Sequence, residues 1–431
     1  MLFHSVEFFF LFSGTFIGFW LIPHHRLRML WLLGASFGFY GSWNPWLMFV
    51  VVFSAAFDFL IAQRIEASPS PKARRFLLIV SICVSLGILG FFKYTNFLLD
   101  SAVSTFNFFG FDYRHPAFRI VLPLGISFYT FETISYVMDV YRGRLRAERN
   151  FLDYALFIMF FPLGLVKKAL IADQMPAIVD PVFASPSDFS TEAVWIAVFC
   201  YATQIYCDFS GYSDMALGTA HAFGFKLPQN FNLPYAACNI TEFWRRWHIS
   251  LSTWLRDYLY IPLGGNRHGT AATYRNLILT MLLGGLWHGA GWSFVFWGLY
   301  HGSLLAVHRV FASRSRPIEG PFKPVRIAFT FLCVCIGWVL FRAESMTDAW
   351  LILRRMFTLS EGQTFETAEV AIALAAWTAV ILGHLVSSYI DMRSALRWLP
   401  APVIATGMAV VFLLVQVLMP HRGGAFIYFQ F

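Results

Sequence analysis

The chain is poor in charged residues. Only 13% of its 431 residues are Asp, Glu, Lys or Arg, while 58% are hydrophobic. Soluble domains carry about 25% charged residues, so this composition excludes an ordinary soluble protein. It predicts a membrane protein instead, with 49 Phe and 15 Trp suited to lipid-facing surfaces and interfacial belts.

Cysteine is also scarce, and the six cysteines lie mostly within apolar stretches. Cys333 and Cys335 are two residues apart in an expected helix, so they cannot face one ligand together. This pattern favours buried thiols over a disulfide framework or a zinc site. We therefore expect no bound metal and no resident cofactor.

The sequence lacks the common motifs of soluble enzymes. It has no phosphate-cradling glycine loop, no Ser-His-Asp order and no specific nucleic-acid motif. Its formal net charge is +8, but the basic residues sit in short loops between apolar runs. That placement is typical of membrane-topology signals, so we expect no nucleic-acid partner.

Long apolar runs are abundant, and a helix needs about 20 such residues to cross a bilayer. The runs predict an all-α, polytopic transmembrane helical bundle of about 10–11 membrane helices, with re-entrant or interfacial helices, around a central funnel. Segments 151–191 and 226–275 are too short or too polar to span, which places the re-entrant region between residues 151 and 290. The expected spans are Val6–Ile22, Leu27–Trp43, Trp46–Ala62, Phe76–Leu98, Val121–Val140, Phe151–Pro162, Val194–Phe225, Asn276–Val310, Val325–Leu340, Val370–Ile390 and Val403–Met419.

Loop charges predict the orientation of these spans. Loops at 26–28, 64–75, 142–149, 314–326 and 393–397 are basic, whereas those at 44–45, 100–119 and 343–367 are less basic or mixed. The positive-inside rule puts the first basic loop in the cytoplasm and the N-terminus outside. The first apolar run lacks a basic start and a cleavage site, so we expect it to be retained.

Two histidines, each following a tryptophan, lie in or beside these apolar runs: His248 after Trp247, and His288 after Trp287. An unpaired titratable side chain at bilayer depth costs several kcal/mol, which makes it a functional candidate. Histidine can accept a hydroxyl proton and return it to a leaving group near neutral pH. The pair predicts proton-transfer or acyl-transfer chemistry; the alternative is a packing histidine, and His221, His301, His308 and His384 show that histidine alone is a weak signal.

The stretch around His248 predicts one amphipathic helix at the membrane interface. On a helical wheel Arg245, His248, Ser252 and Arg256 share a narrow arc beside an aromatic face. Arg245 and its neighbour Arg246 would then point toward an anionic ligand or lipid headgroups. A surface-anchoring helix without a ligand is the alternative.

A third polar cluster contains Asp208, Ser210 and Asp214 within an apolar run. It predicts either the lining of a polar tunnel or charge partners for the arginines. An acid/base pair is disfavoured, because carboxylates six residues apart on a helix point in different directions. Asp58 and Lys93, also near spans, are explained by pairing inside the bundle.

Taken together, the sequence closely resembles the membrane-bound O-acyltransferase (MBOAT) family, specifically its bacterial branch of alginate O-acetyltransferases and related cell-wall acyltransferases. The resemblance covers nearly the whole chain in the same order. The matching strings are LPLGISFYTF at 122–131, DFSGYSD at 208–214, NFNLPY at 230–235, RRWHIS at 245–250, YIPLGGNR at 260–267, GLWHG at 285–289, FRA at 341–343 and FIYFQF at 426–431.

The resemblance implies an O-acyltransferase in which His288 is the principal catalytic histidine and His248 the second active-site polar position. The donor expected for this branch is cytoplasmic acetyl-CoA, and the acyl group passes through the bundle to the far side. The implied partners are membrane lipid, an extracytoplasmic acetyl-transferring protein and a polysaccharide, in the bacterial inner (cytoplasmic) membrane. Further candidates for the substrate path are Arg245, Arg246, Asp208, Ser210, Asp214 and Trp287.

The resemblance also implies that residues 1–431 form one integral-membrane domain. In the family, the stretch that resembles 160–162 is followed by a longer segment before a Gly-Leu-X-Lys-Lys run. Here Leu163 alone separates Pro162 from that run, so the segment after Pro162 is shortened by roughly one helix and its loops. Two other functions stay open: a noncatalytic scaffold of a polymer-secretion complex, and a proton-coupled transporter or flippase that uses the 208–214 carboxylates.

Overall fold

The structure, a computed structural model, describes residues 6–42, 44–113, 119–123, 125–147, 167–222, 227–312 and 322–389. Within these ranges the chain is built from helices without β-strands, which confirms the all-α class. It folds as two compact units, Met1–Phe161 and Pro162–Phe431. The expected spans at 151–162 and 403–419, and the string at 426–431, lie outside the described residues.

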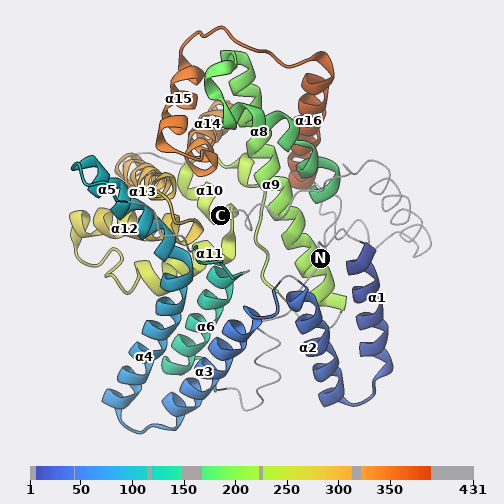
Figure 1. Ribbon diagram of the computed structural model, residues 1–431, viewed down its shortest axis with the longest axis vertical. Coiled ribbons are helices and arrows are strands. Elements are labelled where there is room, and N and C mark those ends of the chain that lie inside the picture. Colours follow the sequence, from blue (N-terminus) through green and yellow to red (C-terminus); the bar gives the residue numbers. More distant parts are fainter. Residues whose placement is uncertain are drawn as a thin grey trace. The chain divides into compact units, whose positions relative to one another are not determined.

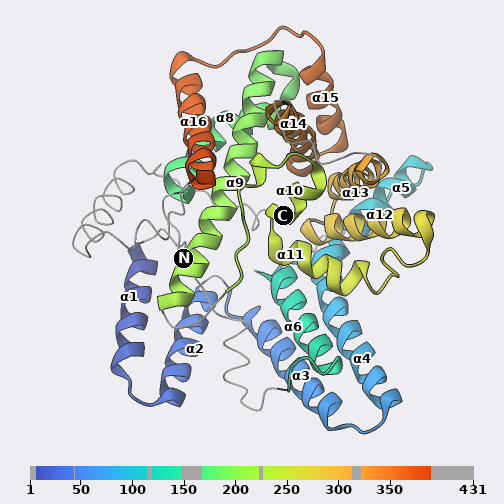
Figure 2. The same cartoon turned by 180° about the vertical axis from the view of Figure 1, so that it is seen from behind.

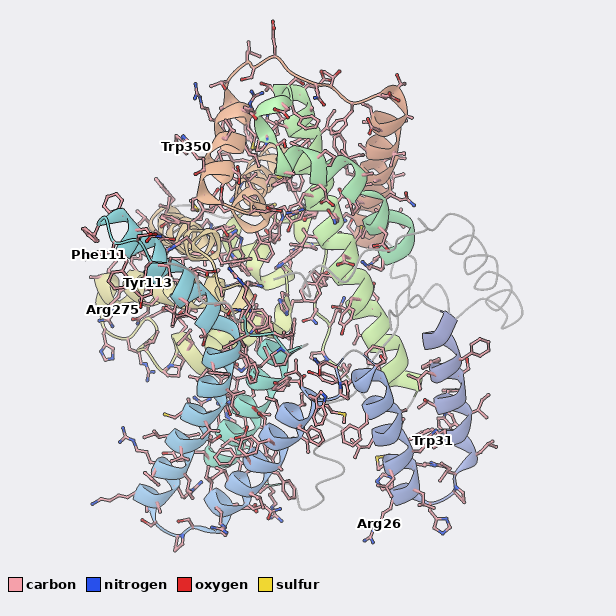
Figure 3. All side chains as sticks on the ribbon, viewed as in Figure 1. Arg26, Trp31, Phe111, Tyr113, Arg275 and Trp350 are labelled. Carbon is pink, nitrogen blue, oxygen red and sulfur yellow. The ribbon has the colours of Figure 1, made fainter. Side chains whose placement is uncertain are left out.

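The first unit begins with a helical hairpin of α1 (Val6–Leu21) and α2 (His25–Gly41) (Figure 1). Trp31 of α2, labelled in Figure 3, donates its indole N–H to the carbonyl of Thr15 at 3.0 Å. A Cβ on Gly18 would lie 2.5 Å from the Nε1 atom of Trp31. The glycine therefore makes room for the ring that joins the two helices.

The core of the first unit is formed by α3 (Met48–Ala67), α4 (Pro71–Leu89) and α6 (Ile126–Tyr141). α4 begins where Ser70 accepts the Ala73 N–H at 3.4 Å, with a proline at the first helical position. It continues through a π-helical turn, η1 (Gly90–Tyr94), into α5 (Thr95–Phe108). The apolar faces meet at Ala55, Ala62, Ile65, Val137 and Val140.

Two ionisable side chains inside the first unit are both hydrogen-bonded. Asp58 accepts from the hydroxyls of Ser81 at 2.6 Å and Ser85 at 3.2 Å. Lys93 donates to the hydroxyl of Ser127 at 3.1 Å. This is the bundle-internal pairing that the sequence predicts for Asp58 and Lys93.

The second unit is organised around α9 (Thr191–Ala222), which is packed by α8 (Pro176–Ala184), α14 (Lys323–Arg342), α15 (Met346–Phe357) and α16 (Thr367–Tyr389) (Figures 1 and 2). Before α8 the chain forms short turns, η2 (Lys167–Ile171) and η3 (Ala172–Gln174), and after it η4 (Pro186–Asp188). α15 is an amphipathic helix inside segment 343–367, which the sequence predicts to be a loop; that prediction is wrong for Met346–Phe357. Its Ala349 and Ile352 are fully buried, whereas Trp350 is 70% exposed and points away from the helix (Figure 3).

Shorter pieces connect α9 to α14: η5 (Pro234–Ala236), α10 (Ile240–Arg246), α11 (Ile249–Trp254), η6 (Leu255–Tyr260), α12 (Gly269–His288) and α13 (Trp292–Ala312). The single span expected at 276–310 is wrong, because the chain breaks between α12 and α13. Gly289, with φ −157° and ψ 152°, takes an extended conformation that ends α12.

Glycines bring the backbones of α12 and α13 into direct contact. A Cβ on Gly285 would lie 2.2 Å from the carbonyl oxygen of Phe294, and one on Gly298 would lie 2.4 Å from that of Met281. Small residues allow helices to approach this closely. The tight hairpin fixes His288, the last residue of α12.

Four helical segments in the described ranges are long and apolar enough to cross a membrane. They are Met48–Ala67, Pro71–Phe108, Lys323–Arg342 and Thr367–Ser388. These segments, in a chain of helices, confirm a helical membrane bundle. The total number of membrane helices, the central funnel and the single-domain organisation stay predictions.

Candidate active site

His248 lies at a sharp turn between two short helices. α10 ends at Arg246, α11 starts at Ile249, and His248 has φ 42° and ψ 58°. A non-glycine residue in this left-handed conformation costs about 1–2 kcal/mol. The predicted polar stripe on one helix is therefore wrong, because Arg245 and Ser252 belong to different helices.

The segment around Asn230 holds this turn in place. The Asn230 carbonyl accepts the Ile249 N–H at 2.9 Å, and its side-chain oxygen accepts the N–H and hydroxyl of Ser250 at 3.2 and 2.6 Å. Nearby, the Asn232 N–H donates to the carbonyl of Arg246 at 3.0 Å. Two of the matching strings, at 230–235 and 245–250, are thus hydrogen-bonded to each other.

Trp247 anchors the turn and His248 follows it into the interior. Trp247 is 1% exposed, and its ring lies 5.0 Å from Phe231 and 4.9 Å from Trp338. The His248 ring is 4% exposed and lies 4.5 Å from Phe209 of α9, nearly perpendicular to it. The strained turn therefore directs the imidazole toward α9.

His288 lies among aromatic rings from three helices. Its ring is 4.8 Å from Trp287 of α12, 5.0 Å from Trp297 of α13 and 5.1 Å from Phe341 of α14, measured between centroids. The residue is 5% exposed. Its neighbours are protein side chains held by the α12–α13 hairpin and α14, so the orientation of the imidazole is restricted.

The two histidines belong to one aromatic cluster. Trp287 joins them, because its ring lies 6.0 Å from His248 as well as 4.8 Å from His288. Phe209 closes one end of the cluster and Phe341 the other. Residues from the matching strings at 208–214, 245–250, 285–289 and 341–343 meet here, although they are far apart in the sequence.

Burial controls the protonation of this site. It lowers the pKa of His248 to about 3, because the charged imidazolium would lose its hydration. His248 is therefore neutral at physiological pH and a weak proton acceptor, which suits it to orienting groups by hydrogen bonds more than to general-base catalysis. Within the described ranges no three His, Cys, Asp or Glu side chains gather as metal ligands would.

The two arginines have different surroundings. Arg246 pairs with Glu242 at 2.7 Å and donates to the carbonyl of Asn232 at 3.4 Å, so it helps to hold the His248 turn. Arg245 is exposed. Of the two, Arg245 is the one accessible to an anionic ligand.

The ion pairs found for the α9 carboxylates are with lysines, not with the predicted arginines. Lys168 Nζ lies 2.8 Å from Asp208 and 2.7 Å from Asp173, and all three side chains are buried. Lys167 pairs with the exposed Asp214 at 2.6 Å. Adjacent lysines point in different directions and so reach carboxylates six residues apart on α9.

Other residues around the cluster were not singled out from the sequence. The spacing of Trp297 and His301 could have drawn attention to Trp297. The two residues are four apart in an apolar run and share a face of α13. Phe341 is marked in the sequence only by the FRA string at 341–343. Ser210, expected on the substrate path, is 1% exposed on α9.

These features define a class: a multi-pass helical membrane protein with two buried histidines in one aromatic cluster. Residues 145–347 match the model of "MBOAT, membrane-bound O-acyltransferase family". The chain is 41% identical over 432 residues to "Probable alginate O-acetylase AlgI" of Azotobacter vinelandii, covering 91% of this chain and 85% of that protein. It is also 41% identical to the protein of that name in Pseudomonas aeruginosa (91% and 82% covered), and 36% identical to "Peptidoglycan O-acetyltransferase" of Helicobacter pylori (84% and 80% covered).

The chain therefore belongs to the membrane-bound O-acyltransferase family, as its matching strings predict. It is an O-acyltransferase and a multi-pass membrane protein. The aromatic cluster around His248 and His288 is its candidate active site.

Proposed function

We propose that this protein transfers acetyl groups from cytoplasmic acetyl-CoA for O-acetylation of an exopolysaccharide or cell-wall polymer. The observation that carries the proposal is the convergence of His248, Trp287 and His288 in one buried cluster. The names of the relatives support acetyl as the acyl group. Since those names specify alginate in one case and peptidoglycan in another, the acceptor shared by both is a polymer hydroxyl.

In the proposed reaction His288 acts as the general base. It takes the proton from an acceptor hydroxyl, whose oxygen forms a bond to the thioester carbonyl carbon. The carbon–sulfur bond then breaks, and the proton passes from His288 to the departing thiolate, which leaves free CoA and an acetyl ester. A positioned general base contributes about 10²–10⁴-fold to the rate. His248, neutral and joined to His288 through Trp287, assists by orienting the reacting groups.

In this proposal the exposed guanidinium of Arg245 binds acetyl-CoA by donating charge-assisted hydrogen bonds to its phosphates. Arg246 contributes indirectly, because its bonds to Glu242 and Asn232 stabilise the His248 turn. Ser210 and Trp287 lie on the proposed substrate path, while Asp208 and Asp214 support its wall through their lysine partners.

We place the protein in the bacterial inner membrane with its N-terminus outside, because the basic loops then face the cytoplasm. An extracytoplasmic partner protein would complete the transfer to the polysaccharide. The alignment with the Azotobacter vinelandii relative is 432 residues long but takes in 91% of the 431 residues here. A few tens of its positions thus have no counterpart in this chain, as a shortened segment would require.

The shortened segment that the sequence predicts after Pro162 would favour a second candidate, a noncatalytic scaffold for polymer secretion. The two functions differ in whether the imidazoles are needed. A scaffold lacking His248 and His288 would still support acetylation by another enzyme, whereas an acetyltransferase would not.

The test is the acetyl content of the cell-surface polymer in a His288→Ala strain. We expect acetylation to be lost while the protein remains in the membrane at normal abundance. His268→Ala is the matched control, because His268 is exposed at the other end of α12, and acetylation should persist. Unchanged acetylation in the His288→Ala, His248→Ala double mutant would support the scaffold.

A further inference from the structure

Trp297 is the ring of α13 that contacts His288. The centroids lie 5.0 Å apart and the ring planes meet at 82°. Trp297 is 1% exposed and also lies 5.5 Å from Phe341, the other neighbour of His288. Its indole is thus part of the wall around the imidazole and is shielded from water.

The indole N–H of Trp297 is buried without a hydrogen-bond acceptor among the residues that the structure describes. Such an N–H has lost its hydration and gained nothing in return, so a polar group that reached it would be bound favourably. Phe341, across His288, offers no donor. The Trp297 ring that contacts His288 therefore carries an N–H that is available to an acceptor.

Packing on the far side restricts how Trp297 can move. His301, one helical turn further along α13, is fully buried with its ring 4.8 Å from Trp297. His301 in turn is confined by α14, where a Cβ on Gly337 would lie 2.5 Å from its Nε2 atom. Trp244 of α10 contacts both rings, at 5.7 Å from Trp297 and 5.2 Å from His301.

We propose that Trp297 is a further catalytic residue, whose indole N–H donates a hydrogen bond to the acyl carbonyl oxygen as negative charge develops on it. The inference rests on the proposed acyl transfer at His288. When the acceptor oxygen attacks the thioester carbon, the carbonyl electrons move onto oxygen. A hydrogen-bond donor fixed in a water-poor site stabilises that charge without having to reorient during the reaction. The tetrahedral intermediate then collapses, the carbon–sulfur bond breaks and the thiolate leaves.

The experiment compares kcat and KM for acetyl-CoA in the full chain reconstituted in lipid vesicles. Trp297→Phe removes the N–H, and we expect kcat to fall about 10²–10³-fold with little change in KM. Trp377→Phe is the matched control on α16, where the ring packs on Phe199 at 5.4 Å and should not affect kcat. Replacement of Trp297 by 3-benzothienylalanine keeps the bicyclic shape and exchanges the N–H for sulfur.

A comparable loss of kcat in both Trp297 variants supports the donor role. Near-normal kcat in the benzothienylalanine protein would overturn it, because ring shape alone would then suffice. Near-normal kcat in Trp297→Phe would overturn it as well. Failure of the proposed function would look different: the wild-type protein itself would show no His288-dependent acetyl transfer.

Discussion

The two compact units place selected buried polar groups in different surroundings. In the first unit Asp58 is satisfied by two serine hydroxyls and Lys93 by a third, on helices that pack through regular apolar faces. In the second unit His248 and His288 lie against aromatic rings, at a left-handed turn and at the end of a glycine-packed helix. Hydrogen bonds to serine hydroxyls fit a framework. Imidazoles that lie against aromatic rings, one at a left-handed turn and one at the end of a helix, fit a reactive site.

The largest stability effect is expected at the buried ion cluster of the second unit. Lys168→Met would leave Asp173 and Asp208 buried without their shared cation, which costs about 3–5 kcal/mol for a broken buried pair. Lys167→Met removes only an exposed pair, worth about 0–1 kcal/mol. Thermal unfolding in detergent checks both, and equal losses would show that Lys168 is not buried as described.

Two polar substitutions that roughly preserve side-chain shape test whether the rate depends on His248 of the second unit and not on Asp58 of the first. Asn tolerates the left-handed conformation of residue 248, so His248→Asn should keep the turn but lose the imidazole. We expect acetyl transfer to fall about 10–10²-fold, less than for the general base itself. Asp58→Asn keeps an acceptor oxygen for one serine and offers an amide N–H to the hydroxyl oxygen of the other, so it should leave the rate unchanged. A rate loss in Asp58→Asn equal to that in His248→Asn would remove the distinction.

Glycine substitutions test the difference in packing. Gly298→Ala places a Cβ 2.4 Å from the Met281 carbonyl and should destabilise the second unit by about 1–3 kcal/mol. Gly87→Ala on α4 meets nothing within 4 Å and should be neutral or stabilising by up to about 1 kcal/mol. The two melting temperatures should therefore move in opposite directions. A neutral Gly298→Ala would mean that α12 and α13 do not touch there.

The last comparison concerns the pH dependence of stability. The pKa of His248 is lowered to about 3 in the folded protein, whereas an unfolded histidine titrates near about 6.5. Below that pH the unfolded chain binds a proton that the native site excludes, so stability falls by about 1.4 kcal/mol per pH unit from this group. The melting temperature should drop between pH 7 and pH 5, and less so in His248→Asn. An identical drop in the variant would contradict a buried neutral ring.

Much of the framework could be predicted from the sequence, because apolar runs set helix length. The span expected at Leu27–Trp43 is α2 (His25–Gly41), and that at Val194–Phe225 is α9 (Thr191–Ala222). The burial of His248 and His288 could also be predicted from the apolar runs around them. The contact of Trp287 with both histidines could not be predicted, because it depends on how separate helices pack.

Local periodicity is a poor guide where long-range contacts override it. The helical pattern over residues 245–256 predicts a continuous helix, but Asn230 accepts hydrogen bonds from Ile249 and Ser250 and so holds His248 in a left-handed turn. The lysine partners of Asp208 and Asp214 lie some forty residues earlier in the chain, so helical spacing within α9 gives no sign of them.

The most direct test is whether the purified protein in lipid vesicles releases CoA from acetyl-CoA in an acceptor-dependent reaction that needs His288. We expect turnover by the wild-type protein and a loss of about 10²–10⁴-fold in His288→Gln, with unchanged folding by thermal unfolding. Turnover in His288→Gln at the wild-type rate would contradict the assignment of acyl transfer to this imidazole.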